Sequence, residues 1–339
     1  MGEFSSVIKA LKRHSKRSRN EYVLVLDAMN VFISSFISVN SINAKGQHIG
    51  GIVGFLKSLG YINRILKPTR IICVFDVKGG SYNRRAINPN YKANRSNQRI
   101  SKNALFSSIV EEKEAINNQL ERLKDYLETL PVEVVTVERA EADDVISYLS
   151  QSFSKRGSRV TIVSTDKDFL QILNENISVY IPRQKKLHTT TSIQDKIEVL
   201  PINYLIVKAI CGDKSDNLPG VRGIGTKTLV KIVPQLKTTP TTLQEIYDFI
   251  SERVDKKTSY ANIIINWDRV KQNYELMNLQ TPFLDEDQKK EIISQLTKIN
   301  TNLNTGAFLH YLQQDYIDGI VNNTEAWLFE FKYLSALKP

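Results

Sequence analysis

Three short runs of apolar residues are nearly uninterrupted, which is typical of strands buried on both faces of a sheet. These runs are Tyr22–Leu26, Arg70–Phe75 and Arg159–Val163, and Val132–Val137 is a fourth candidate. Between them, apolar residues recur at helical spacing in Gly50–Leu66, Leu105–Leu130 and Asp143–Phe153. Strands that alternate with helices predict an α/β fold with a mostly parallel central sheet flanked by helices.

The strand pattern stops after about Leu200 and a helical pattern replaces it. Short helices are predicted at Ile202–Cys211, Lys227–Val233 and Leu243–Val254, followed by a mostly helical remainder from Tyr260 with a loop at Leu296–Asn304. We therefore expect three parts: a basic N-terminal extension (1–20), an α/β domain (21–200) and a helical domain (201–339). The basic segment Val7–Asn20 is either a solvated extension or an arm that contacts phosphates.

Composition narrows the class of partner only slightly. The formal net charge of +10 favours a polyanionic partner, although charge alone does not identify one. Two cysteines, Cys73 and Cys211, argue against a disulfide scaffold and a cysteine-rich zinc site. No apolar run is long enough to span a membrane and no signal-peptide pattern is present, so we expect a cytoplasmic protein without a membrane partner.

Acidic residues follow three of the predicted strands. Asp27 ends the first, Asp76 ends the second, and Asp166 and Asp168 follow the third. In open parallel sheets, ligands bind beyond the carboxyl ends of the strands. An Asp in this position can instead cap the next helix, but that explanation is harder to apply to all three strand ends together.

Two further segments add acidic residues. Glu141, Asp143 and Asp144 lie at the start of a predicted helix, where they could share a site or simply complement the helix dipole. Asp213 and Asp216 precede a glycine-rich turn, where turn capping is the alternative explanation.

Convergence of these nine carboxylates would require cations to offset their repulsion. Ligands that are all oxygen point to Mg²⁺ or Mn²⁺, and two such ions about 4 Å apart can activate water and stabilise the leaving oxygen of a phosphodiester. No nucleophile–His–acid pattern is visible around the four histidines.

A basic loop with interleaved aromatic residues follows Asp76, at about 77–102. Its basic residues would contact phosphates while bases stack on its tyrosines, as in single-stranded nucleic acid binding. The residues concerned are Tyr82, Arg84, Arg85, Tyr91, Lys92, Arg95, Arg99 and Lys102. The alternative is a solvated loop without a ligand.

The glycine-rich turn contains Gly220, Gly223 and Gly225 and opens a helix that carries Lys227 and Lys231. Glycines allow the backbone to approach closely, and free N–H groups at the helix start can hold a phosphate. A tight helix–helix turn is the alternative, and the lack of a preceding strand argues against a dinucleotide-binding fold.

Together these segments resemble the 5′-nuclease (flap endonuclease) superfamily from about Tyr22 to Val233. The most specific motifs are Glu141-Ala142-Asp143-Asp144, Ser164-Thr165-Asp166-Lys167-Asp168 and Gly212–Gly225. Within the superfamily, Ser81–Arg95 and Tyr180–Lys186 look most like T-even-type phage ribonuclease H. Those phage proteins are 5′-to-3′ exonucleases with flap activity that remove RNA primers.

The resemblance implies a PIN-like nuclease domain and two metal sites. One ion would bind Asp27, Asp76, Glu141 and Asp143, and the other Asp143, Asp166, Asp168 and one or both of Asp213 and Asp216. Asp144 would be a ligand or lie just behind the ligands. Lys92 and Arg95, supported by Arg84 and Arg85, would approach the scissile phosphate from the base of an arch.

The resemblance also implies substrates and partners. A helix–three-turn–helix at about 202–233 would grip duplex DNA and bind K⁺. The substrates would be DNA with a 5′ flap or 5′ end and RNA–DNA hybrids, bound by a monomer that could meet a single-strand-binding protein. The first twenty residues have no counterpart in the family, Ala28 stands where glycine often follows the first Asp, and Thr301–Pro339 is unassigned.

Two other functions compete with this interpretation. A non-catalytic, structure-specific DNA-binding protein would gain nothing from acids that repel phosphate. A small RNA-cleaving toxin of related sheet architecture would be shorter and would lack the arch and the glycine-rich turn. The sequence leaves open the preference for RNA or DNA and the balance between exonuclease and flap cleavage.

Overall fold

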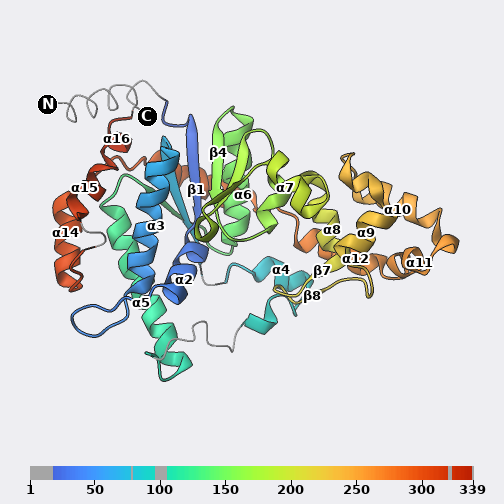
Figure 1. Cartoon of the computed structure of the whole chain (residues 1–339), viewed down its shortest axis with the longest axis horizontal. Helices are drawn as coiled ribbons and strands as arrows, with labels where there is room; N and C mark the ends of the chain where they lie inside the picture. The colour runs from blue at the N-terminus through green and yellow to red at the C-terminus, as the bar shows by residue number, and fades with distance from the viewer. Residues whose placement is uncertain (1–17, 78, 96–104, 320–322, 338–339) are drawn as a thin grey trace.

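A six-stranded sheet forms the centre of the computed structural model, which describes residues 18–77, 79–95, 105–319 and 323–337 (Figure 1). The strand order is β3-β2-β1-β4-β5-β6, and all neighbours are parallel except the edge strand β6. The strands are β1 (Tyr22–Asp27), β2 (Arg70–Phe75), β3 (Glu133–Thr136), β4 (Arg159–Val163), β5 (Ile177–Ile181) and β6 (Lys186–His188). The predicted α/β fold and its four predicted strands are confirmed.

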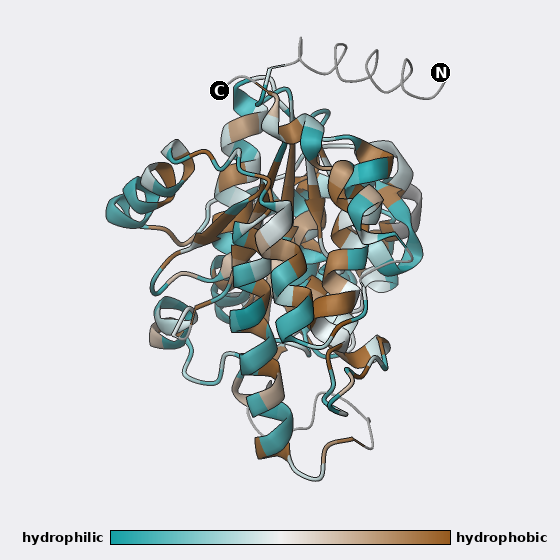
Figure 2. Ribbon diagram, turned by 90° about the vertical axis from the view of Figure 1, so that its left-hand side faces the viewer, coloured by the Kyte–Doolittle hydropathy of each residue, from teal (hydrophilic) through white to brown (hydrophobic). Residues whose placement is uncertain are grey.

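Alternation along each strand sends side chains to two separate cores. In β1, Leu24 and Leu26 enter one core, whereas Val23 and Val25 enter the other. The first core includes α2 (Ala28–Ser38), α3 (Gly50–Leu66) and α5 (Ile109–Glu128), and the second includes α6 (Ala142–Lys155) and α7 (Thr190–Ile197). Burial on both faces explains the continuous apolar strands, which form the brown centre of Figure 2.

A helical unit with its own core lies to one side of the sheet (Figure 1). Its helices are α8 (Tyr204–Cys211), α9 (Thr226–Ile232), α10 (Leu243–Ser251), α11 (Thr258–Ile265) and α12 (Trp267–Leu276). Between α8 and α9, the two-residue strands β7 (Gly212–Asp213) and β8 (Leu218–Pro219) form a hairpin. No helix in the described ranges is long and apolar enough to cross a membrane.

The end of the chain returns to the sheet, which corrects the expected helical domain at 201–339. Apolar residues of α13 (Glu286–Thr297) join the second core, and those of α14 (Thr305–Gln314) and α15 (Thr324–Phe329) join the first, as do those of α16 (Lys332–Ser335). Arg19 also donates hydrogen bonds to the carbonyls of Leu334 and Leu337. These amphipathic helices bury their apolar faces against the two cores of the sheet. Helical periodicity alone does not reveal which part of the protein such a face contacts.

Parts of two predicted segments lie outside the described residues. These are residues 1–17 of the basic extension, and residues 78 and 96–102 of the basic loop at about 77–102, which we call the arch. The described arch contains α4 (Tyr82–Ile87) and a short 3-10 turn at Ala93–Arg95. Tyr91 of the arch packs with Leu205, Leu218 and Leu276 of the helical unit, so the two parts share a small core.

Candidate active site

Four carboxylates from separate segments line one pocket at the carboxyl edge of the sheet. Asp27 ends β1, Asp76 follows β2, Asp166 follows β4, and Asp143 lies in the first turn of α6. They meet because β1, β2 and β4 are neighbouring parallel strands. We call this set the strand-end carboxylates. Lys92 lines the same pocket.

Local hydrogen bonds hold two of these carboxylates, Asp27 and Asp76, in place. Asp27 accepts from the Ser164 hydroxyl at 2.8 Å and from the backbone N–H of Asn30 at 3.1 Å. Asp76 accepts from the N–H of Ala142 at 2.8 Å, at the start of α6. Asp27 therefore caps α2 and lines the pocket at once, so the capping and site interpretations are compatible.

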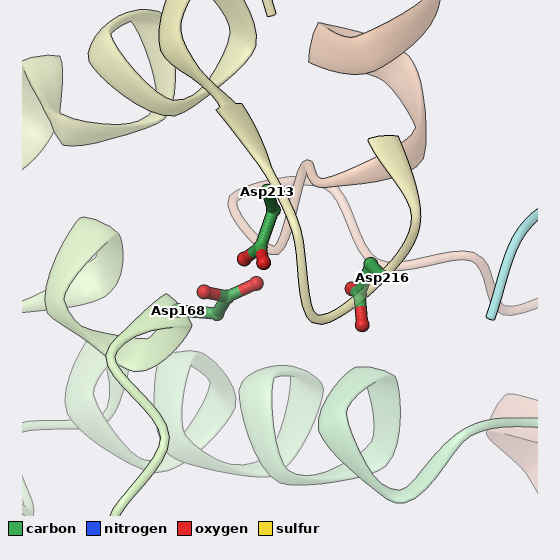
Figure 3. A group of neighbouring side chains, drawn as sticks. All are labelled: Asp168, Asp213 and Asp216. Atoms are coloured by element: carbon green, nitrogen blue, oxygen red, sulfur yellow. The ribbon is translucent and has the colours of Figure 1, made fainter. Parts of the chain in front are cut away.

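Three more carboxylates, Asp168, Asp213 and Asp216, form a second group, which we call the loop carboxylates. Oxygens from all three lie within 4.8 Å of one another. Asp168 follows β4 and the other two lie on the β7–β8 hairpin, and Figure 3 shows Asp168 and Asp213 turned toward each other. The Asp168 N–H donates to Asp166 at 2.8 Å, which links this group to the strand-end carboxylates.

Lys208 of α8 is a site residue that the sequence analysis missed. Its ammonium pairs with Asp168 and lies 2.7 Å from an oxygen of Asp213. Although burial opposes the charge of the Asp213 carboxylate, Lys208 lowers the pKa of Asp213 to about 2. A single lysine within the apolar run of α8 was the available signal, because a buried ammonium requires an acidic partner.

The electrostatics of both groups favour a bound cation. Burial, together with the charges of Asp76 and Asp166, raises the pKa of Asp27 to about 7. Burial and the charge of Asp166 also raise the pKa of Asp143 and bring that of Asp168 to about 7, the latter against the effect of Lys208. An oxygen-only donor set with such mutual repulsion fits a hard divalent cation.

Glu141 and Asp144 support basic residues in the structure and do not line the pocket. Glu141 accepts hydrogen bonds from Lys92, Arg84 and Tyr91 at 2.9, 2.9 and 3.1 Å. Asp144 is fully buried, and its two carboxylate oxygens accept hydrogen bonds from the two terminal nitrogens of Arg84. We therefore correct the expected contact of Arg84 with substrate, because its buried guanidinium is already held by these two acids.

The arch residues divide into buried and exposed groups. Tyr91 is 2% exposed and its hydroxyl donates to Glu141, so the predicted stacking of bases on Tyr91 is wrong. Tyr82 is 66% exposed, and Arg85 is also exposed on α4. Arg99 and Lys102 lie outside the described residues, as does the side chain of Arg95.

Two family models together match residues 22–300 of the chain. Residues 22–198 match the N-terminal resolvase-like domain of 5′-3′ exonucleases, and residues 199–300 match their C-terminal SAM fold. The chain belongs to the 5′-3′ exonuclease family.

Relatives and solved structures agree with this family. A 5′-3′ exonuclease of Buchnera aphidicola is 29% identical over 236 residues, which is 69% of this chain and 76% of that protein. DNA polymerase I of Thermus filiformis is 30% identical over 215 residues, which is 63% of this chain but only 24% of that protein. The bacteriophage T5 flap endonuclease, solved with DNA and metal ions, shares the fold at a TM-score of 0.61 and 18% identity, covering 87% of this chain and 99% of its own.

The glycine-rich turn of this exonuclease is set by close backbone contacts. A Cβ atom on Gly220 would overlap the carbonyl group of Cys211, because the N–H of Val221 bonds to Ile210 across the turn at 2.8 Å. Gly223 has a φ of +81°, a conformation that favours glycine. Gly225 has open space around it and precedes α9, where Lys227 and Lys231 are exposed one turn apart.

Two glycine variants test whether the turn needs glycine because a side chain would clash at Gly220. Gly220→Ala is expected to destabilise the exonuclease by about 1–3 kcal/mol, because the new methyl group forces the β7–β8 hairpin away from α8. Gly225→Ala should remain within about 0.5 kcal/mol of the wild type. Urea unfolding measures both, and equal midpoints would contradict the described turn.

Proposed function

We propose that this exonuclease hydrolyses phosphodiesters near the 5′ end of DNA, or of RNA annealed to DNA, and that it also cleaves 5′ flaps. The observation that carries the proposal is the meeting of four carboxylates from three strand ends and α6 around a pocket that Lys92 also lines. Two Mg²⁺ ions are the expected cofactors, and Mn²⁺ should substitute because it accepts the same oxygen ligands.

The strand-end carboxylates would hold one ion, and the loop carboxylates would contribute to the other. When bound, such ions activate water and stabilise the leaving oxygen of a phosphodiester. Glu141 and Asp144 would act from behind these ligands, by positioning Lys92 and Arg84.

Lys92 would neutralise charge on the substrate phosphate. Burial opposes its protonated form, but Asp143, Glu141 and Asp216 outweigh that effect and raise the pKa of Lys92. The side chain therefore stays cationic at neutral pH and serves as an electrostatic group and not as a base. A left-handed backbone at Lys92 (φ +53°) and a hydrogen bond from its N–H to the Asp216 carbonyl at 2.9 Å hold it at the pocket.

The duplex would contact the helical unit and the arch. Lys227 and Lys231 offer exposed ammonium groups beside the glycine-rich turn, and Arg85 and Tyr82 offer a guanidinium and an aromatic ring on α4. A K⁺ ion bound by backbone carbonyls of the turn would complete the phosphate contact.

Removal of RNA primers during DNA replication, in a phage context, is the proposed biological role. The similarity to DNA polymerase I of Thermus filiformis supports a link to DNA synthesis, because the shared part accompanies a polymerase in that protein. The predicted monomer would then work beside replication proteins such as a single-strand-binding protein.

Cleavage of a 5′-labelled flap tests the proposal. With Mg²⁺ the wild type should release labelled product, and a chelator should stop it. Asp166→Asn should bind the flap normally but cut it at least about a hundredfold more slowly, because it removes a carboxylate of the pocket. Asp287→Asn, a change at a side chain that is 91% exposed on α13, should cut at the wild-type rate. Undiminished turnover by Asp166→Asn would contradict the site.

A further inference from the structure

The carboxylate pocket has a second end lined by hydrogen-bond donors. Asn30 and Ser34 lie one turn apart on α2, and Arg183 reaches the pocket from the turn that joins β5 to β6. The same three residues also line an adjoining hollow that none of the strand-end carboxylates line, so they form one end of the pocket. This end differs chemically from the end formed by the strand-end carboxylates.

Thr165 orients the amide of Asn30 toward the pocket. Its backbone N–H and its hydroxyl both donate to the side-chain oxygen of Asn30, at 3.0 and 2.9 Å. These two bonds assign the oxygen of that amide to Thr165, so its NH₂ group is left to donate elsewhere. No acceptor for this NH₂ group, or for the Ser34 hydroxyl, occurs in the part of the chain that the structure describes.

Arg183 is an exposed cation on a short turn. It lies in the 3-10 turn Pro182–Gln184, which Pro182 begins and Lys185 ends in a left-handed conformation. Within the described ranges its guanidinium has no ion pair, and it also lines the two hollows that adjoin the pocket. An arginine placed beside four carboxylates but paired with none of them is available to a ligand.

Hydrogen-bond donors that lack acceptors within the protein favour an anionic ligand. A guanidinium offers two parallel N–H groups to the two non-bridging oxygens of a phosphodiester, and the amide and the hydroxyl can donate to further lone pairs of the same oxygens. A metal ion would find no carboxylate among these three side chains, and the amide oxygen of Asn30 already accepts two hydrogen bonds from Thr165. This end of the pocket therefore complements the strand-end carboxylates. A nucleic-acid strand laid across the pocket presents one phosphate to each end.

We propose that Asn30, Ser34 and Arg183 bind the phosphate that neighbours the one being cut in the same strand. This inference rests on the proposed nuclease function and adds a second anchor to it. The anchor fixes the register of the strand and thereby decides which phosphodiester reaches the strand-end carboxylates. Arg183 is thus a substrate-positioning residue at the second end of the pocket.

Methylphosphonate linkages test the contact, because each replaces one charged phosphate with a neutral group. A set of 5′-labelled substrates carries a single methylphosphonate at successive positions around the main cut. With the wild type, we expect a roughly ten- to hundredfold fall in kcat/KM when a phosphate adjacent to the cut is neutral. Arg183→Ala should show a loss of similar size on the unmodified substrate.

The decisive experiment combines Arg183→Ala in the protein with a single methylphosphonate in the substrate. At the adjacent phosphate that Arg183 contacts, Arg183→Ala and the methylphosphonate together should cost no more than either alone. At every other position their effects should multiply. Arg183→Lys, which keeps the charge but loses the paired N–H groups, should recover part of kcat/KM and use a less uniform cut position.

Arg156→Ala is the matched control, since Arg156 is an exposed arginine at the other end of α6, about 20 Å from Asp143. It should leave kcat/KM and every methylphosphonate effect unchanged. Multiplicative effects of Arg183→Ala at all positions would overturn the inference, while wild-type cleavage would still support the proposed nuclease function. Failure of the wild type to cleave any unmodified substrate would instead count against the proposed function itself.

Discussion

Asp27→Asn is expected to reduce metal-dependent cleavage at least about a hundredfold and yet raise the melting temperature of the metal-free protein. The carboxylate is 5% exposed and shares its pocket with Asp76, Asp143 and Asp166. Without a cation these charges repel one another. An amide removes one of the charges but can still accept the hydrogen bond of the Ser164 hydroxyl.

The difference in stability between Asp27→Asn and the wild type, both without metal, should increase with pH. In the folded protein, burial raises the pKa of Asp27 from its ordinary 3.8 to about 7. The wild type therefore loses stability as pH rises from about 4 to about 7, and the loss is complete above that range. Asn has no such titration, so in EDTA the variant should melt a few degrees higher at pH 8 and no higher at pH 4. A variant that melts at or below the wild-type temperature at pH 8 would contradict this account.

Arg84→Met is expected to destabilise the protein by about 3–5 kcal/mol, because it leaves the buried Asp144 carboxylate without its cation and Glu141 with Lys92 alone. Arg84 is 3% exposed, pairs with Glu141 and Asp144, and donates to the Leu276 carbonyl at 2.7 Å. It therefore ties the arch to α6 and to the end of α12. The same variant should lose activity, since Glu141 also positions Lys92.

Arg85→Met is the control for that measurement, because Arg85 is the next residue of α4 and is exposed. Its change should remain within about 0.5 kcal/mol of the wild type. Urea unfolding of both variants gives the comparison, and similar midpoints would show that the Arg84 cluster is not a structural support.

Hydrophobic patterning predicted β1, β2 and β4 because these neighbouring strands are buried on both faces of the sheet. The run Arg159–Val163 was predicted with its observed bounds, and Gly50–Leu66 likewise. Two strands were missed: β5 (Ile177–Ile181), which lies between β4 and β6, and the edge strand β6 (Lys186–His188). The latter has three residues and is defined by its pairing with β5, a tertiary contact that a local pattern cannot contain.

The acidic residues of the site were predictable, but the cations around them were not. Parallel-strand geometry was enough to bring Asp27, Asp76 and Asp166 to one edge. Which basic residue is buried against which acid depends on packing between distant segments. For this reason the sequence did not reveal that Arg84 forms a buried ion pair with Asp144. Nor did it reveal that Lys208, from the otherwise apolar helix α8, pairs with Asp168 in the site.

The central claim is that distant acidic residues form one site for divalent metal, and crystals soaked in Mn²⁺ test it most directly. Anomalous scattering should place Mn²⁺ among Asp27, Asp76, Asp143 and Asp166, with a second ion near the loop carboxylates. In crystals of Asp143→Asn the first peak should weaken strongly. Manganese bound elsewhere on the protein while this pocket stays free of it, in crystals that still cleave DNA when Mn²⁺ is supplied, would contradict the account.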